Sequence, residues 1–147
     1  MSAYKAKTVR LPLVELGKRH FSVEQANGSL ILVRRIVSDI VSEYQKVLDQ
    51  QEILEVHQRA HEDDSARQTQ AAIVALVERL QAYADELVDI GVEMKDWAAG
   101  VIDFPCQVGN SQVQLCWQHG ESGITHWHPN EEPCSARRRI ETLPAES

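Results

Sequence analysis

Residues 21–58 decide the fold and read FSVEQANGSLILVRRIVSDIVSEYQKVLDQQEILEVHQ. Ser22 is followed three residues later by Gln25, the capping-box spacing that begins a helix. From there, apolar side chains recur at alternating steps of three and four residues, which is the period of a helix with one buried face. They are Val23, Ala26, Leu30, Val33, Val37, Ile40, Tyr44, Val47 and Leu54. The spacing predicts a helix over 23–58, unless Asn27-Gly28 forms a turn that delays its start to Ser29.

A second helix is predicted over residues 65–90. The polar stretch at 58–64 ends in acidic residues, which favour the positive N-terminal end of a helix dipole. An apolar seam then runs from Ala66 to Ile90, and Gly91 stands where a C′ glycine ends a helix. Because the connection between the two helices is short, they are expected to form an antiparallel hairpin.

After Gly91 the helical period gives way to short β-like runs at 92–95, 101–104, 112–117 and 124–128, separated by glycine-containing turns. This pattern predicts an α+β fold, with a long antiparallel helical hairpin followed by a small antiparallel β-sheet. The chain divides into a basic arm (1–20), the hairpin (21–91), a sheet module (92–140) and a tail (141–147).

The predicted hairpin is too long for the predicted sheet to cover. A helix over 23–58 would extend roughly 54 Å, whereas strands of five or six residues span only about 17–20 Å. The seam of the distal half would then be shielded poorly by two helices alone. We therefore expect a homodimer through helices 23–58 and 65–90, as a four-helix bundle or coiled coil.

Composition excludes several classes of protein. The 147 residues carry a net charge of -7, concentrated after the basic arm, and an acidic surface repels a phosphate backbone, so nucleic-acid binding is not expected. No uncharged apolar run is long enough to span a membrane, and the N-terminus does not resemble a signal peptide. The odd number of cysteines, far apart in sequence, favours reduced thiols in the cytoplasm.

The strand register predicts one apolar and one polar face. Pairing Leu115 with Trp127 gathers apolar side chains on one side and leaves Cys116 opposite His126 on the other. The polar face then carries Asp103, Cys116, His126 and His128, with Glu121 in the adjoining loop. A thiolate, imidazoles and carboxylates are ligands of Zn²⁺ or a related divalent transition metal. The alternative is a sheet that simply exposes one polar face to water.

Other chemistry has little support in the sequence. No glycine-rich phosphate loop and no Gly-x-Ser-x-Gly elbow occurs. Cys116 beside His126 could form a nucleophile pair, but a cysteine inside a strand is more often a small buried hydrophobe. No catalytic residue is therefore assigned.

Five short motifs resemble a family of small bacterial proteins catalogued as domain of unknown function two thousand two hundred and three. They are FSVEQAN at 21–27, GVEMKD at 91–96, GVIDFP at 100–105, LCW at 115–117 with Gly120-Glu121, and Trp127-His128. The resemblance covers about 21–140 and implies a helical region followed by a compact C-terminal module, with no activity or cofactor to carry over. The residues that match the family pattern are Lys95, Asp96, Asp103, Cys116, Trp117, Glu121, His128 and Arg137.

Two functions remain open from the sequence. One is a homodimeric interaction or scaffold protein in which the sheet is mainly structural. The other is a metal- or small-anion-binding domain, which could be a metal-assisted enzyme. In the second, the metal ligands come from the polar face and the ligand-binding residues are Lys95, Asp96, Trp117 and Arg137.

Overall fold

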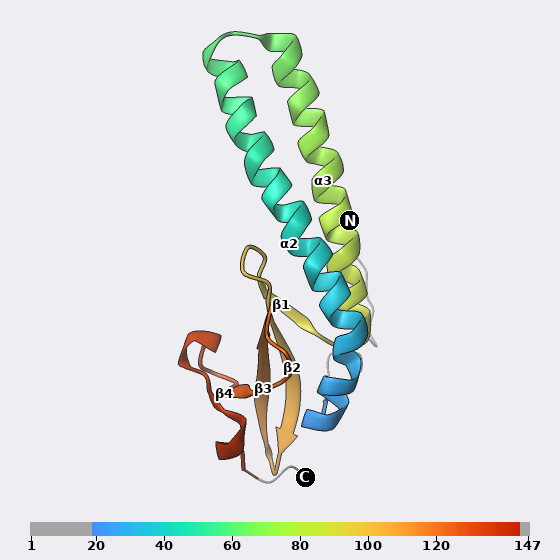
Figure 1. Ribbon diagram of the computed structural model, residues 1–147, viewed down its shortest axis with the longest axis vertical. Helices are drawn as coiled ribbons and strands as arrows, with labels where there is room; N and C mark the ends of the chain where they lie inside the picture. Colours follow the sequence, from blue (N-terminus) through green and yellow to red (C-terminus); the bar gives the residue numbers. More distant parts are fainter. Residues whose placement is uncertain (1–18, 145–147) are drawn as a thin grey trace.

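A computed structural model describes residues 19–144, in which two long helices stand on a small sheet (Figure 1). Helix α2 (Val23–Arg59) and helix α3 (Asp63–Ile90) form an antiparallel hairpin. The sheet contains β1 (Glu93–Asp96), β2 (Val101–Val108), β3 (Ser111–Gln118), β4 (His126–Pro129) and β5 (Arg138–Arg139), with short 3₁₀ turns η1 (Cys134–Ala136) and η2 (Ile140–Thr142). The predicted α+β architecture is confirmed, and the predicted arm lies almost wholly outside the described residues.

Helix α2 begins at the capping box. The Ser22 side chain accepts the backbone N–H of Gln25 at 3.0 Å, and the Gln25 side chain accepts the backbone N–H of Ser22 at 3.0 Å. The helix then continues through Asn27-Gly28, so the alternative turn does not form. Instead, Asn27 Oδ1 accepts the backbone N–H of Ile124 at 2.9 Å and ties the helix to the sheet. Helix α3 begins two residues earlier than predicted and ends at Gly91, whose φ of 104° is the left-handed conformation expected there.

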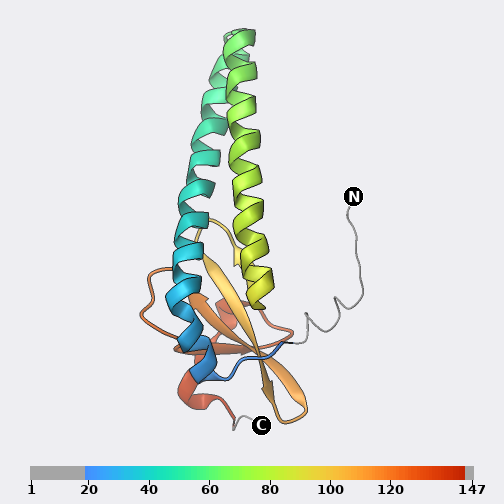
Figure 2. The same cartoon turned by 90° about the vertical axis from the view of Figure 1, so that its right-hand side faces the viewer.

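The seam predicted from the sequence is the contact between the two helices. Val47 of α2 and Leu76 and Leu80 of α3 are buried along it. Beside them lies Glu43, whose carboxylate accepts hydrogen bonds from Arg79 and Lys46 at 3.1 Å each. The distal part of the hairpin extends well beyond the sheet (Figure 2). No described helix is long and apolar enough to cross a membrane.

The five strands form one antiparallel meander in the order β1-β2-β3-β4-β5. Leu115 pairs with Trp127 and Cys116 pairs with His126, which confirms the predicted register. Between β2 and β3, Asp103 pairs with Cys116 and Phe104 with Leu115. One face of the sheet is therefore apolar and the other polar.

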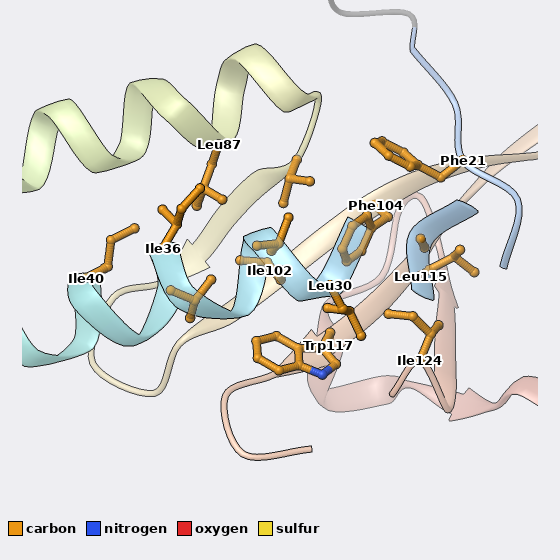
Figure 3. Close-up of a cluster of buried hydrophobic side chains, with 14 of the residues drawn as sticks. Phe21, Leu30, Ile36, Ile40, Leu87, Ile102, Phe104, Leu115, Trp117 and Ile124 are labelled. Atoms are coloured by element: carbon orange, nitrogen blue, oxygen red, sulfur yellow. The ribbon is translucent and has the colours of Figure 1, made fainter. Parts of the chain in front are cut away.

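The apolar face packs on the base of the hairpin and forms the core (Figure 3). Phe104 and Trp117 of the sheet are almost completely buried there. The Phe21 ring meets that of Phe104 edge-on, with 5.2 Å between centroids. Other core residues are Leu30, Ile36 and Ile40 from α2, Leu87 from α3, and Ile102, Leu115 and Ile124 from the sheet region. This packing fixes the sheet with its polar face directed away from the helices.

Three features of the C-terminal region differ from the prediction. Strand β2 continues past Phe104 through Pro105 to Val108. Residues 138–139 add a short fifth strand beside β4. The segment assigned to a tail contacts the sheet, because Thr142 accepts a hydrogen bond from the Trp127 indole N–H at 3.0 Å.

Candidate metal and thiol site

The polar face carries two adjacent rows of side chains across the central strands. Asp103, Cys116 and His126 are paired across β2, β3 and β4 in one row. Gln114 and His128 are paired in the next row. Successive residues of a strand point to opposite faces, so Gln114 and Cys116 share a face, as do His126 and His128. The register thus places Asp103, Cys116 and His128 on one face at the centre of the sheet.

Cys116 and Cys134 are joined by a disulfide, with 6.2 Å between their Cα atoms. Cys116 lies within β3, while Cys134 begins the 3₁₀ turn η1 that follows β4. The prediction of three reduced thiols is therefore wrong for these two. Cys106 is not part of the disulfide and is buried in the core. Cys134 was not predicted as a site residue, because its segment has no periodicity that would place it on the sheet.

Asp103 and His128 form a buried pair beside the disulfide. The imidazole Nε2 of His128 lies 3.1 Å from both carboxylate oxygens of Asp103. The other ring nitrogen, Nδ1, is 2.8 Å from the backbone carbonyl of Pro129, which can only accept a hydrogen bond, so Nδ1 is the donor. One further proton must then lie between Nε2 and the carboxylate, because otherwise lone pairs would face each other. Burial raises the pKa of the Asp103 carboxyl, against the opposing influence of His128.

Ligand atoms of a metal-binding type converge at this point. A carboxylate oxygen of Asp103 and the sulfurs of Cys116 and Cys134 all lie within 4.8 Å of one another. Two thiolates and a carboxylate, with an imidazole adjacent, are a donor set suited to Zn²⁺ and other divalent transition metals. Two of the predicted metal ligands, Asp103 and Cys116, belong to this cluster, and a third, His128, contacts it through Asp103.

Gln114 adds an unsatisfied polar atom on the same face. Its amide nitrogen donates to Asn130 Oδ1 at 2.6 Å, but its Oε1 is buried and has no hydrogen-bond partner among residues 19–144. A buried acceptor without a donor costs about 1–3 kcal/mol. Gln114 also lines the same surface as Asp103 and His128.

Glu121 and Arg137 form an ion pair at the edge of the site. Arg137 Nη1 and Nη2 donate to the two Glu121 oxygens at 3.2 and 2.6 Å. Nη1 also lies 4.0 Å from Cys116 Sγ. Burial tends to raise the pKa of Glu121, but hydrogen bonds from Arg137 and from the backbone N–H of Gln118 hold it below its ordinary value. Glu121 therefore positions Arg137 and is not among the converging ligand atoms.

The other residues predicted for the site lie apart from the cluster. His126 Nδ1 contacts Thr125 Oγ1 at 2.9 Å. Trp117 lies on the opposite face, in the core, and donates its indole N–H to the Glu121 carbonyl. Lys95 pairs with Glu93, and Asp96 accepts the backbone N–H groups of Ala98 and Ala99.

A cleft of about 760 Å³ opens over the cluster. Its floor includes Asp103, Gln114, His128 and Cys134. Lys95, Asp96 and Arg137 also line it, so three of the four residues predicted to bind a ligand border the same cleft as the cluster. Both cationic side chains are already paired with carboxylates, and this leaves little positive charge for an anion.

The fold and the cleft define a class of protein in which a helical hairpin carries a small sheet, with a disulfide and a buried carboxylate on the polar face of that sheet. Residues 19–140 match the family described as "Uncharacterized conserved protein (DUF2203)", and the chain belongs to that family. No curated protein and no solved structure matches the chain at a significant level.

Proposed function

We propose that the reduced protein binds one divalent transition metal ion, such as Zn²⁺, on the polar face of the sheet. The observation that carries this proposal is the convergence of Asp103, Cys116 and Cys134, whose ligand atoms lie within 4.8 Å of one another. Thiolates take up a metal only when the disulfide is open and the thiols have lost their protons. The metal-binding form is therefore the dithiol.

The neighbouring residues support the same proposal. His128 Nε2 contacts both oxygens of Asp103, so it either orients the ligating carboxylate or joins it as a ligand. The buried Oε1 of Gln114 is free to accept a hydrogen bond from water held near the ion. A bound metal would act as a Lewis acid at the base of the cleft. The reduced site fits the cytoplasm, which keeps thiols reduced, and we propose this compartment.

Metal content tests the proposal directly. The full chain is reduced, equilibrated with Zn²⁺ without oxygen, freed of unbound metal and analysed for zinc per chain. We expect about one equivalent in the wild type, and loss of most of it in Cys134→Ser and in Asp103→Asn. Cys106→Ala is the matched control, because it removes a thiol from the core and should leave the zinc content unchanged. Absence of zinc from the reduced wild type contradicts the proposal.

A second function, dimerisation through the hairpin, is favoured by exposed apolar side chains on its distal half. Ile53 and Val56 of α2 lie three residues apart on one helix face, and so do Val74 and Val77 of α3. All four are at least 42% exposed in the single chain. A second copy of the hairpin would remove this apolar surface from water. We propose a homodimer with the distal hairpins in contact, and the sheet modules remaining accessible.

Sedimentation velocity tests the dimer. We expect the wild type to sediment as a dimer at micromolar concentration, and the Ile53→Glu/Val77→Glu double variant as a monomer. Gln68→Glu places one added charge on an exposed position of α3 and should leave the dimer intact. A monomeric wild type contradicts this proposal without affecting the metal site.

A further inference from the structure

The two sulfurs of the disulfide differ in how far solvent can reach them. Cys116 is completely buried within β3. Cys134 is half-buried and lines the cleft. An external thiolate must approach a disulfide sulfur directly, so access favours attack at Cys134. Cys116 is then the sulfur that leaves.

A cationic side chain stands next to the leaving sulfur. Arg137 Nη1 is 4.0 Å from Cys116 Sγ, and the two-point contact with Glu121 holds the guanidinium in place. A thiolate is stabilised by a nearby positive charge, and a better-stabilised thiolate leaves faster. Arg137 therefore favours Cys116 as the sulfur that leaves when the disulfide is attacked.

The backbone around the two cysteines also differs. Cys116 is held in the middle of the sheet between β2 and β4. Cys134 begins a three-residue 3₁₀ turn directly after Pro133, and none of the described strands pairs with it. The Cys134 side can therefore move when the disulfide opens, and it has room in the cleft for an added group.

We propose that the Cys116–Cys134 disulfide is an exchange site for low-molecular-weight thiols of the glutathione type, and that this exchange controls metal uptake. The control of metal uptake rests on the proposed function, whereas the exchange itself does not.

The reaction balances with two thiols. A first external thiolate attacks Cys134 Sγ, forming a mixed disulfide on Cys134 and releasing Cys116 as a thiolate. A second external thiolate attacks the external sulfur of that mixed disulfide, which releases Cys134 as a thiolate and the external disulfide as product. Two electrons pass from the two external thiols to the protein. The two protein thiolates are then available to a divalent metal ion.

Glutathione is the probe for the first part of the test. In a Cys106→Ala background, Cys116→Ser and Cys134→Ser each leave one thiol, and both variants are incubated with glutathione disulfide and followed by intact-mass spectrometry. We expect Cys134 to form the mixed disulfide at least about tenfold faster than Cys116, because only Cys134 is reached from the cleft. Equal rates, or a faster reaction at Cys116, would overturn the proposal. Circular dichroism checks whether both variants keep the fold. If one variant has lost it, the mixed disulfide is trapped in the wild type instead, and peptide analysis shows which cysteine carries the glutathione.

Zinc content of the oxidised and reduced wild type is the second part. We expect about one equivalent in the glutathione-reduced chain and loss of that zinc after reoxidation. Equal, non-zero zinc in both forms overturns the control of metal uptake and shows that the zinc is bound without the two thiolates. No zinc in either form overturns the proposed function, while the labelling of Cys134 still decides the exchange. Arg137→Met should slow reduction of the wild-type disulfide by glutathione several-fold, and Arg137→Lys should restore part of the rate.

Discussion

His128 Nε2 lies 3.1 Å from both carboxylate oxygens of Asp103, in a position where each side chain is at most 3% exposed. A pair this deeply buried is stable only while each member satisfies the other, because an ionised carboxylate left alone in the interior loses its hydration without compensation. The same two residues border the disulfide, so the pair is both a structural element of the sheet and part of the candidate site.

Removal of His128 should therefore cost more stability than neutralising Asp103. We expect His128→Ala to lower the free energy of unfolding by about 3–5 kcal/mol near neutral pH. Asp103→Asn should cost clearly less, because the carboxamide keeps the shape and can donate a hydrogen bond to Nε2. Urea denaturation of the oxidised chain measures both. Equal losses in the two variants would show that the pair is not coupled.

The raised pKa of Asp103 predicts a pH dependence. A carboxyl whose pKa is higher in the folded than in the unfolded state adds stability below its ordinary value of 3.8, and that contribution is lost as pH rises through the folded pKa. Relative to Asp103→Asn, the wild type should thus lose stability as pH is raised above 3.8. The test is to measure the unfolding free energies of the two proteins at a series of pH values. The value for the wild type minus that for Asp103→Asn should fall as pH rises, and a rise with pH would contradict the raised pKa of Asp103.

Glu121 should show the opposite dependence. Its pKa is lowered in the folded state, mainly because the hydrogen bonds from Arg137 and Gln118 outweigh the effect of burial. Its contribution to stability is present above its ordinary pKa of 4.5 and is lost as pH falls through the folded value. We expect Glu121→Gln to remove this part of the acid sensitivity and to cost about 1–3 kcal/mol at pH 7. If the unfolding free energy of Glu121→Gln falls with acid as steeply as that of the wild type, the lowered pKa of Glu121 is contradicted.

Two glycines provide a matched pair for the fold. Gly28 lies within α2, and a Cβ there would meet nothing within 4 Å, so Gly28→Ala should stabilise the protein by about 0.5–1 kcal/mol. Gly100 has a φ of 72°, and a Cβ there would lie 2.7 Å from His119 Cβ, so Gly100→Ala should destabilise by about 1–3 kcal/mol. Thermal unfolding compares them. Destabilisation by Gly28→Ala would mean that the helix does not continue through Asn27-Gly28.

The parts of the fold that could be predicted are those that local chemistry determines. The capping box at Ser22 and Gln25, the apolar seam and the C′ glycine at Gly91 each act within a few residues. The register of β3 and β4 followed from burial alone, because shifting Leu115 by one residue would have placed it on the polar face. For this reason the sequence alone predicts that Asp103, Cys116 and His128 share one surface.

The extension of β2 could not be predicted, because Pro105 ordinarily argues against a strand. Strand β1 pairs with β2 only as far as Asp103, so beyond that point this edge of β2 has no strand partner within the described part of the chain. The Pro105 carbonyl accepts the backbone N–H of Phe21 at 2.7 Å at this edge. The amide nitrogen of a strand residue points to the same edge as its carbonyl, so the missing N–H at Pro105 breaks no bond with β3.

Cys134 could not be predicted for a different reason. Its distance from Cys116 depends on the turn after β4, which is shaped by contacts remote in sequence and has no repeating pattern. Strand alternation puts Gln114 on the same face as Cys116, but its unsatisfied oxygen depends on side-chain positions that a strand pattern does not specify. The disulfide and the orphaned acceptor are thus properties of the tertiary structure.

Co²⁺ absorption spectroscopy of the reduced chain tests most directly whether both cysteines and Asp103 bind one metal ion. Co²⁺ replaces Zn²⁺ in such sites, and thiolate bonded to cobalt gives an intense charge-transfer band in the near ultraviolet. We predict that this band saturates at about one equivalent of Co²⁺ in the wild type and in Cys106→Ala, and that it is strongly reduced in Cys116→Ser and Cys134→Ser. A reduced wild-type protein that gives only the spectrum of hydrated Co²⁺ would contradict the account.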